Sequence, residues 1–136
     1  MKFNAKLLFV TIYLIVDLIY VISSKDVYNN VVINIQGRSM PNPKGTRLFA
    51  GLAAYICMAL GWYFLVADKI ERSGASKVQS AIFYGVIFGL SVYGTFNFTL
   101  HVMLDNYDIP IVLRDLIWGT SWVTILSTMY ALYLQK

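Results

Sequence analysis

Ionisable side chains stand inside stretches of sequence that are otherwise apolar, and these are the residues that could do chemistry. Asp17 interrupts the first apolar run, His101 stands near the end of the third, and Asp115 stands at the entrance of the fourth. In such surroundings, carboxylates and a histidine can carry protons, bind a ligand or join helices by hydrogen bonds. Each of these groups needs a partner, because burying a charge in apolar surroundings is costly unless it is paired.

Helical spacing gives Asp17 polar neighbours on its own segment. Tyr13, Tyr20 and Ser24 stand four, three and seven residues from it, so a helix would carry all of them on one face. That face is expected to point towards protein rather than lipid. Asp17 either binds a proton or a ligand, or it pairs with Lys25 or a neighbouring helix, and the sequence leaves both readings open.

The third apolar run has small and polar residues at intervals of four. Gly85 and Gly89 form a G-x-x-x-G motif, which lets another helix approach closely. The same face continues through Tyr93, Asn97 and His101, although a single histidine is more often structural than a metal ligand. A helix with further polar groups on a second side is expected to lie centrally in a bundle. That second set comprises Ser80, Tyr84, Ser91, Thr95 and Thr99.

The fourth run begins with a charged pair, followed by two tryptophans. Trp118, Gly119 and Trp122 follow Asp115 at offsets of three, four and seven, so carboxylate, indole and glycine share one helix face. Tryptophan at a membrane boundary is ordinary, but an inward-pointing aspartate beside it suits a ligand or proton site. Arg114 either neutralises this aspartate or faces lipid headgroups.

The elements that must position these side chains are four apolar runs long enough to cross a bilayer. They cover about residues 3–23, 48–67, 78–104 and 111–134. A hydrocarbon core about 30 Å thick needs roughly 20 helical residues. Hydrophobic residues make up 58% of the chain and charged residues 13%, with a mean hydropathy of +0.62. We therefore expect an all-α, integral membrane four-helix bundle that forms a single transmembrane domain over residues 1–136.

An additional helix is expected after the first span. In residues 25–37, Val27, Val31 and Ile35 stand four apart, which is typical of an amphipathic helix at the membrane interface or in continuation of the span. Gly37 suits the C-terminus of this helix.

The remaining connections are short. Residues 68–77, DKIERSGASK, are charged and contain glycine and serine, so they predict a solvated turn between antiparallel helices. The acidic segment DNYDIP ends at Pro110, which fits the first turn of the fourth helix.

Charge and composition limit the classes of partner. The net charge is +4, but the cations are scattered without a basic stripe, so we expect a lipid bilayer and no nucleic acid as partner. No metal-ligand spacing and no cofactor motif occur, so we expect neither a bound metal nor a cofactor. Without a small-x-small cleavage site, the first span is expected to be retained. With four spans, both termini should lie on the same side of the membrane. The loops and ends on that side carry six Lys and Arg residues and the other side carries five, so the count does not decide which side is cytoplasmic.

Three segments resemble a known family. VDLIYVISSKDVY, FGLSVYGTFNFT and LRDLIWGTSW are similar to a family of small, predicted four-helix membrane proteins of unknown function, found in bacteria and some large DNA viruses. The family motifs are an Asp before an aromatic residue in helix one, K-D-x-Y after it, Y-G-T-aromatic-D-x-T in helix three, and D-x-x-W-G-T in helix four. They fall here on Asp17, Lys25, Asp26, Tyr28, Tyr93, Gly94, Thr95, Thr99, Asp115, Trp118, Gly119 and Thr120.

The chain departs from these motifs at one position. The family usually has Asp where this sequence has Asn97, which keeps the hydrogen bonds but loses the charge. If the family's function needs that carboxylate, this member is altered or inactive. The resemblance implies a fold and a location, and it supplies no established activity.

Three functional hypotheses follow from the sequence. The first is a non-enzymatic module that packs against itself, as a homo-oligomer, or against a membrane partner protein. The second is a small cavity that binds or transports a lipid or another small ligand. The third is a lipid-modifying enzyme, which has the least support because no nucleophile, metal cluster or cofactor motif accompanies the carboxylates.

Each hypothesis uses the same residues. We expect Asp17, Asn97 and Asp115 to converge at similar depth between the first, third and fourth spans. The full predicted polar cluster is Asp17, Tyr20, Tyr93, Thr95, Asn97, His101, Asp115 and Trp118, and the predicted helix-packing positions are Gly85, Gly89 and Gly119.

Overall fold

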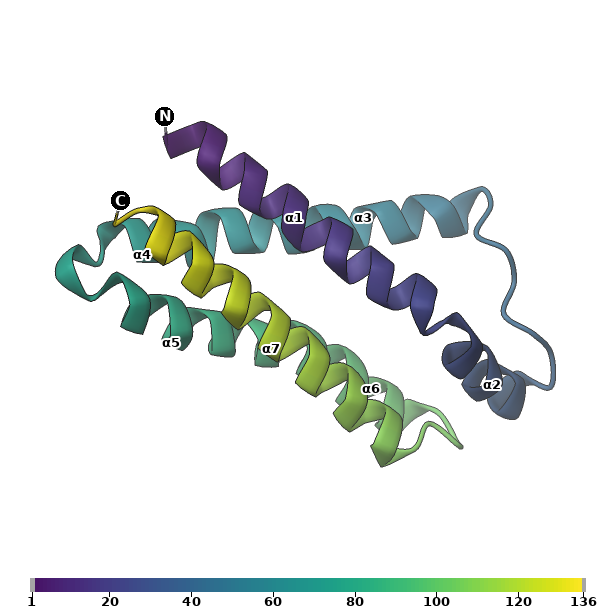
Figure 1. Cartoon of the computed structure of the whole chain (residues 1–136). Helices are drawn as coiled ribbons and strands as arrows, with labels where there is room; N and C mark the ends of the chain where they lie inside the picture. Colours follow the sequence, from purple (N-terminus) through teal and green to yellow (C-terminus); the bar gives the residue numbers. More distant parts are fainter. Residues whose placement is uncertain (1, 136) are drawn as a thin grey trace.

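The computed structural model describes residues 2–135, with side chains from residue 5 onward, and within this range it is helical without any strand (Figure 1). Two π-helical turns, Trp62–Ala67 and Leu90–Gly94, and one 3₁₀ turn, Gly74–Ser76, join some of the helices. The helices are α1 (Lys2–Ser23), α2 (Lys25–Gln36), α3 (Thr46–Gly61), α4 (Asp68–Arg72), α5 (Lys77–Gly89), α6 (Thr95–Met103) and α7 (Ile109–Tyr133).

These elements combine into four helices that are long and apolar enough to cross a membrane. Their exposed surfaces are rich in Leu, Ile, Phe and Val, as expected for surfaces that face lipid. The predicted all-α, four-helix membrane bundle is therefore confirmed. The spans are Ala5–Ser23, Thr46–Arg72, Gly74–Met103 and Ile109–Tyr133.

The prediction of a solvated turn over residues 68–77 is wrong for its first half. The second span continues through α4 to Arg72, and Ile70 within it is fully buried. The turn itself is confined to the 3₁₀ segment Gly74–Ser76 and the residues next to it. Four of the charged residues that suggested a solvated turn belong to the helix α4. Two of them, Asp68 and Glu71, have partners inside the bundle, so their charges do not require exposure to solvent.

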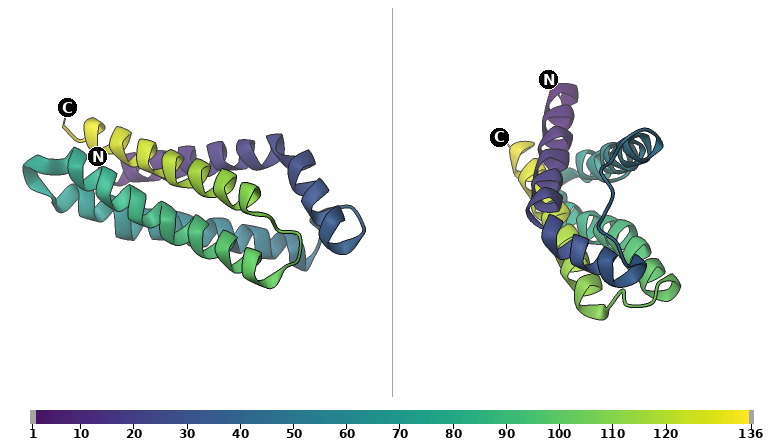
Figure 2. Two further views of the ribbon diagram at one scale, coloured as in Figure 1. Left: turned by 90° about the horizontal axis from the view of Figure 1, so that it is seen from below. Right: turned by 90° about the vertical axis from the view of Figure 1, so that its right-hand side faces the viewer.

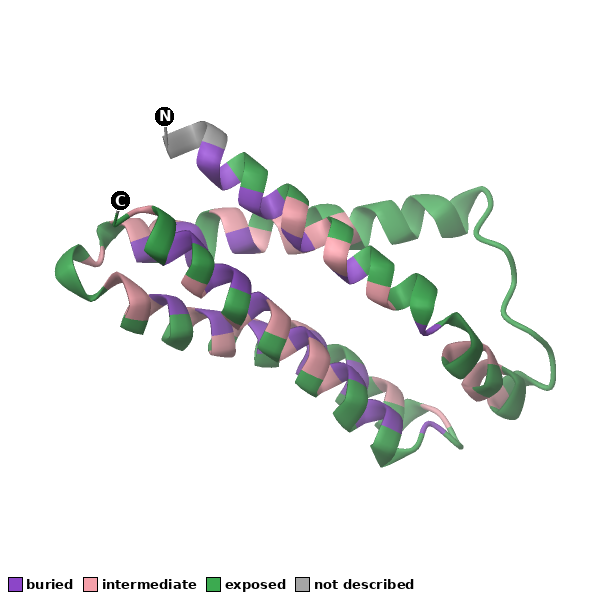
Figure 3. Ribbon diagram, in the orientation of Figure 1, coloured by how far each residue is buried: buried purple, intermediate pink, exposed green. Residues whose placement is uncertain are grey.

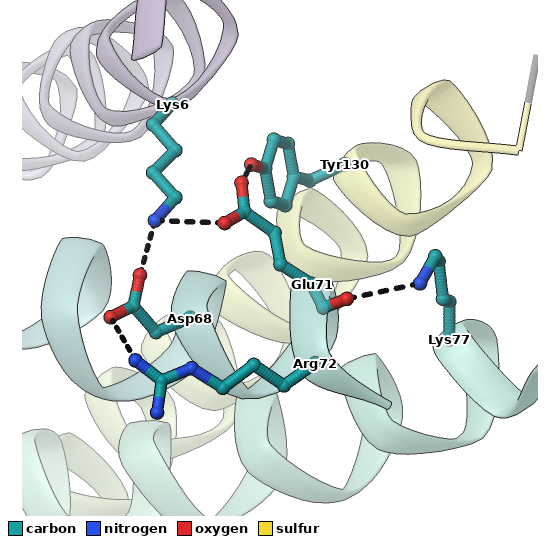
Figure 4. Close-up of polar contacts among 6 residues, drawn as sticks. All are labelled: Lys6, Asp68, Glu71, Arg72, Lys77 and Tyr130. Carbon is teal, nitrogen blue, oxygen red and sulfur yellow. Dashed lines mark hydrogen bonds and ion pairs between the residues drawn. The ribbon is translucent and has the colours of Figure 1, made fainter. Parts of the chain in front are cut away.

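Those partners form the charged cluster in Figure 4. Lys6 of α1 forms ion pairs with Asp68 and, at 3.1 Å, with Glu71, both on α4. The Tyr130 hydroxyl of α7 donates a hydrogen bond to Glu71, and the Lys6 ammonium lies 5.0 Å from the centre of the Tyr63 ring. The Lys6 side chain is only 10% exposed, so it is largely enclosed by this cluster, which ties α1, α4 and α7 together.

Helices α5 and α7 pack closely in antiparallel directions. A Cβ atom on Gly85 would lie 2.8 Å from Thr124 Cα, and one on Gly89 would lie 2.6 Å from Thr120 Cα. Real Cβ atoms do not approach backbone this closely, so the two backbones touch only because these positions carry no side chain.

The bundle is packed tightly at one end and open at the other. The N-terminus of α1 and the C-terminus of α7 lie at the same end as the α4–α5 turn (Figure 2). The buried core lies towards that end and consists of Ala5, Phe9, Val10, Tyr13, Trp62, Val66, Ala67, Ile70, Ala81, Val123, Leu126, Tyr130 and Ala131.

At the opposite end, α3 stands apart from the other helices (Figures 2 and 3). Residues 46–54 are all exposed. Only 11% of the most apolar stretch of the second span is buried, against 28% to 39% of the corresponding stretches in the other three spans. The second span thus leaves the bundle unsealed along part of its length.

The predicted amphipathic helix is present as α2 and lies across this open end. Its residues Tyr28, Val31 and Ile35 pack on a small cluster made by the start of α7 and the preceding loop. Gly37 ends the helix in the left-handed conformation (φ 70°), as its position in the sequence predicts.

The close α5–α7 contact predicts a large effect from a single methyl group. Gly89→Ala should lower the free energy of unfolding by about 1–3 kcal/mol, because the new Cβ would collide with Thr120 backbone. Gly51→Ala is the matched control, since nothing lies within 4 Å of that position. Thermal unfolding in detergent micelles measures both, and equal stabilities would contradict the packing described here.

The charged cluster predicts that Lys6 stabilises the closed end. Lys6→Met leaves Asp68 and Glu71 without their shared cation, and it should cost about 3 kcal/mol or more. Lys69→Met, at an exposed position in the same helix as the two acids, should change stability little. The readout is unfolding in the same detergent, and an unaffected Lys6→Met variant would show that the ion pairs contribute nothing net.

Candidate functional site

The third span presents its polar residues through a local change in helix geometry. The turn Leu90–Gly94 is π-helical, so it contains one more residue per hydrogen-bonded turn than an α-helix. Tyr93 lies in this turn and Asn97 lies one turn later, and both side chains are buried. A Cβ on Gly119 of α7 would overlap the Tyr93 ring, so this glycine provides the space in which the ring lies.

The carboxylate of Asp17 is held by tyrosines from two other spans. Tyr93 donates a hydrogen bond to Oδ1 at 2.7 Å, and Tyr55 of α3 donates one to Oδ2 at 3.1 Å. Since the Tyr93 hydroxyl has only one proton, the Tyr13 hydroxyl at 3.2 Å donates to Tyr93 in turn. Asp17 itself is 5% exposed.

The carboxylate of Asp115 is held in the same manner by different donors. Tyr28 of α2 donates to Oδ1 at 2.6 Å, and Asn97 Nδ2 donates to Oδ2, also at 2.6 Å. The same amide nitrogen of Asn97 bonds to the Tyr93 carbonyl at 2.9 Å, while its oxygen accepts from Tyr107 at 2.7 Å. Asn97 therefore links the surroundings of the two carboxylates.

Asp17, Asn97 and Asp115 lie at matching depth. Each stands six residues from the end of its span on the side of α2, where the spans end or begin at Ser23, Met103 and Ile109. At 1.5 Å per helical residue, this corresponds to about 9 Å. The hydrogen bonds through Tyr93 and Asn97 join them, so the predicted convergence is present.

Neither carboxylate has a cationic partner among the residues that the structure describes. Arg114, next to Asp115 in sequence, instead donates to Ser24 at 3.0 Å and lies 5.9 Å from the centre of the Tyr20 ring. The geometry therefore does not support the alternative in which Arg114 neutralises Asp115. All the donors that reach the two acids are neutral.

Two of the tyrosines lie outside the spans, and both are expected to remain protonated. Burial and the hydrogen bond to Asp115 raise the pKa of Tyr28 well above its usual value. Burial, together with the nearby charge of Asp115, raises the pKa of Tyr107 to about 12. At neutral pH both phenols are therefore stable hydrogen-bond donors.

A cavity of about 670 Å³ opens beside this network. Its walls come from α1, α2, α3 and the third span, and Asp17 and Asp115 both line it. Most of the lining is apolar: Val21, Val31, Val32, Ile35, Met40, Ala54, Met58, Val92, Phe96, Leu100 and Leu104. The polar lining is Asp17, Tyr20, Lys25, Tyr28, Tyr55, Cys57, Tyr93, Tyr107 and Asp115. We refer to it as the intrabundle cavity.

The cavity is open between membrane-spanning helices. Ala54 and Cys57 on the second span and Phe96 on the third line it and are also exposed. Its rim therefore lies partly within the spans, where an inserted protein meets lipid chains.

The other predicted site residues lie at the edge of the network or outside it. The rings of Tyr20 and Trp118 stack with their centres 4.4 Å apart, and Tyr20 lines the cavity. Thr95 is exposed. His101 is also exposed, and its Nδ1 lies 2.6 Å from the Tyr107 carbonyl, so it closes the loop before α7 and does not touch either carboxylate. Among the described residues, no group of three His, Cys, Asp or Glu is placed to hold a metal ion.

Tyr55 and Tyr107 were not predicted as site residues. In the first half of its span, Tyr55 carries the only hydroxyl after Thr46. A phenol within the membrane needs a hydrogen-bond partner, so this isolated tyrosine could have indicated a role in the site. Tyr107 lies in a loop, and nothing in its sequence context indicates that it turns back onto Asn97.

Residues 3–133 match the family described as "Predicted membrane protein (DUF2177)". The chain belongs to this family. The resemblance on which the sequence motifs rest is thereby confirmed, and of those motifs Asp17, Tyr28, Tyr93 and Asp115 form the hydrogen-bonded network of this DUF2177 member. Lys25, Asp26 and Thr99 are exposed. Among curated proteins and solved structures, none matches the chain.

The network predicts that Asn97→Asp makes stability depend on pH. The variant loses the donor to Asp115 and places a second carboxylate within hydrogen-bond distance of it, so one of the two acids must take up a proton or they repel each other. In detergent at pH 8, we expect the free energy of unfolding of the variant to be about 1–3 kcal/mol lower than that of the parent, and at pH 5 we expect a smaller difference.

The matched control is Asn30→Asp, the same change at an exposed position on α2. It should show no comparable difference between the two pH values. Equal stability of Asn97→Asp and the parent at pH 8 would mean that Asn97 does not govern the carboxylate pair.

Proposed function

We propose that this membrane protein binds a small amphipathic molecule in the intrabundle cavity, with the polar part at the Asp17 and Asp115 network and the apolar part between the helices. The observation that carries the proposal is the combination of a cavity of about 670 Å³ with two buried carboxylates in its lining. This volume falls in the range of about 300–1,000 Å³ that is usual for small-molecule sites.

The composition of the lining supports an amphipathic occupant. Eleven of the twenty lining residues have apolar side chains. Five of the nine polar ones are tyrosines, whose rings add apolar surface, and the two acids in the lining come from α1 and α7. Binding sites commonly combine apolar walls with a few placed polar groups that fix the orientation of the ligand. An entirely apolar occupant would offer no donor to the remaining acceptor positions of the carboxylates, and an entirely polar one would have to fill a largely apolar space.

The location of the rim supports entry from the bilayer. Ala54, Cys57 and Phe96 are exposed within the spans, so a molecule dissolved in lipid can reach the cavity without passing through water. At its other end, the cavity reaches Lys25 and Met40, near the interfacial helix α2. In this arrangement, four spans leave both termini on one side of the membrane, and the cavity lies nearer the opposite side.

A packing module is the second candidate, and one observation favours it. Every oxygen of the two carboxylates already accepts a hydrogen bond from within the bundle, so the network also joins α1, α2, α3, α6 and α7. Internal hydrogen bonds of this kind hold membrane helices together. The cavity is the reason to put the binding role first, because packing alone does not call for an open space beside the acids.

The proposal predicts that a bulky residue in the cavity wall displaces the ligand. Ala54→Trp should fill the space from α3, whereas Ala53→Trp, at the neighbouring exposed position outside the lining, should leave it open. The measurement is native mass spectrometry with lipid extraction of protein purified in mild detergent. We expect the parent and Ala53→Trp to carry one small molecule per chain that Ala54→Trp lacks.

Two outcomes would overturn the proposal. One is a co-purifying molecule that Ala54→Trp retains as well as the parent does, which would place it elsewhere on the protein. The other is a parent protein that carries nothing and forms a defined oligomer or a complex with a membrane partner, which would favour the packing role.

A further inference from the structure

The charge of the intrabundle cavity is unbalanced. Asp17 and Asp115 are both more than nine-tenths buried and both line the cavity, yet no ion pair among the described residues involves either of them. By contrast, the acids at the other end of the bundle, Asp68 and Glu71, share the cation Lys6. Buried carboxylates in a membrane are normally paired, so the two acids at the cavity end lack the cationic partner that the acids at the closed end have.

The bonds that these acids make leave room for such a charge. Each carboxylate oxygen accepts one hydrogen bond from a neutral donor within the protein. An ionised carboxyl group has about four acceptor positions, two on each oxygen, so each acid retains capacity for further donors. Because both groups line the cavity, a molecule inside it can supply those donors.

Aromatic rings surround the same space. Five tyrosines and one phenylalanine line the cavity: Tyr20, Tyr28, Tyr55, Tyr93, Tyr107 and Phe96. Faces of aromatic rings attract cations, and aromatic cages are a recurrent means of recognising ammonium groups. The rings and the carboxylates therefore both favour a ligand with a positively charged head group.

We infer that the head group bound in the intrabundle cavity is a cationic amine, held by Asp17 and Asp115 and enclosed by the tyrosine rings. This inference rests on the proposed function and adds the chemical class of its ligand, an amphiphile with an ammonium head and an alkyl tail. The tail follows the apolar walls formed by residues such as Val92, Phe96 and Leu100.

Lys25 is the one cation in the lining, and its position is consistent with this assignment. It is exposed and stands eight residues beyond Asp17, at the start of α2, so it belongs to the rim. A phosphate attached to the amine, as in a zwitterionic phospholipid head, could meet Lys25 there. The amine can therefore belong to a simple alkylammonium or to a phospholipid, and the two sources share the same chemistry at the acids.

The test compares probes that share a twelve-carbon chain and differ only in the head: dodecyltrimethylammonium, dodecylamine, dodecanol, dodecyl sulfate and dodecylphosphocholine. Each is titrated into the purified protein in a neutral maltoside detergent, and one-to-one adducts are counted by native mass spectrometry. We expect the cationic probes to bind on the order of tenfold more tightly than dodecanol, with dodecyl sulfate weakest. Ala54→Trp should remove these adducts, and Ala53→Trp should keep them.

The five probes separate the possible failures without relying on any variant at the acids. If dodecanol binds as tightly as the cationic probes, the head-group inference is overturned, while the proposed cavity still stands. If no probe forms an adduct that Ala54→Trp removes, the proposed function fails as well. Dodecylphosphocholine binding at least as tightly as dodecyltrimethylammonium supports the inference with a phospholipid source, and weaker binding supports it with a free amphiphilic amine.

Neutral variants of the acids provide a second line of evidence. Asp17→Asn and Asp115→Asn should each weaken binding of dodecyltrimethylammonium by about tenfold more than they weaken binding of dodecanol, because only the cationic probe depends on the lost charge. The exchange of one acceptor oxygen for an NH2 donor disturbs the network in the same way for both probes. Asp105→Asn, the same change at an exposed loop position, should alter neither probe. An equal loss for both probes would mean that the acids act only through the fold, and it would contradict their role as the cation site.

Discussion

The hydrogen bond from Tyr93 to Asp17 is the interaction on which the arrangement of this bundle most depends. A carboxylate inside a membrane-spanning helix must find donors within the protein, since lipid offers none. Tyr93 can supply one only because a π-helical turn carries it and because Gly119 leaves space for its ring. One buried charge thereby fixes how the first, third and fourth spans approach one another.

The two ends of the bundle solve the problem of buried charge differently. At the closed end, Lys6 pairs with Asp68 and Glu71 and Arg72 pairs with Asp68, so two cations balance two acids within the protein and a dense core lies beside them. At the open end, Asp17 and Asp115 receive hydrogen bonds from neutral groups only, and a cavity takes the place of the core. This difference in charge balance is the basis for proposing a ligand at the open end.

The second span determines how open the cavity is. Its C-terminal part packs through a π-helical turn against the closed end, and Trp62 within that turn is fully buried and donates to Ser127 at 3.0 Å. Residues 46–54 at its N-terminal end are all exposed, and Tyr55, next along the helix, reaches across to Asp17. The helix α2 closes the end of the bundle without filling the space between the spans.

The sequence by itself determined the number of spans, the helix after the first span, and the presence of polar groups inside the membrane. Hydropathy and helical spacing are properties of short segments, so they can be read before any contact is known, and Asp17, Asn97 and Asp115 stand out for the same reason. Only the tertiary structure decided that Arg114 turns to Ser24, that Tyr55 and Tyr107 join the network, and that α4 extends the second span. These outcomes depend on helix crossings and π-helical turns, which bring together residues far apart in the chain and leave no local pattern in it.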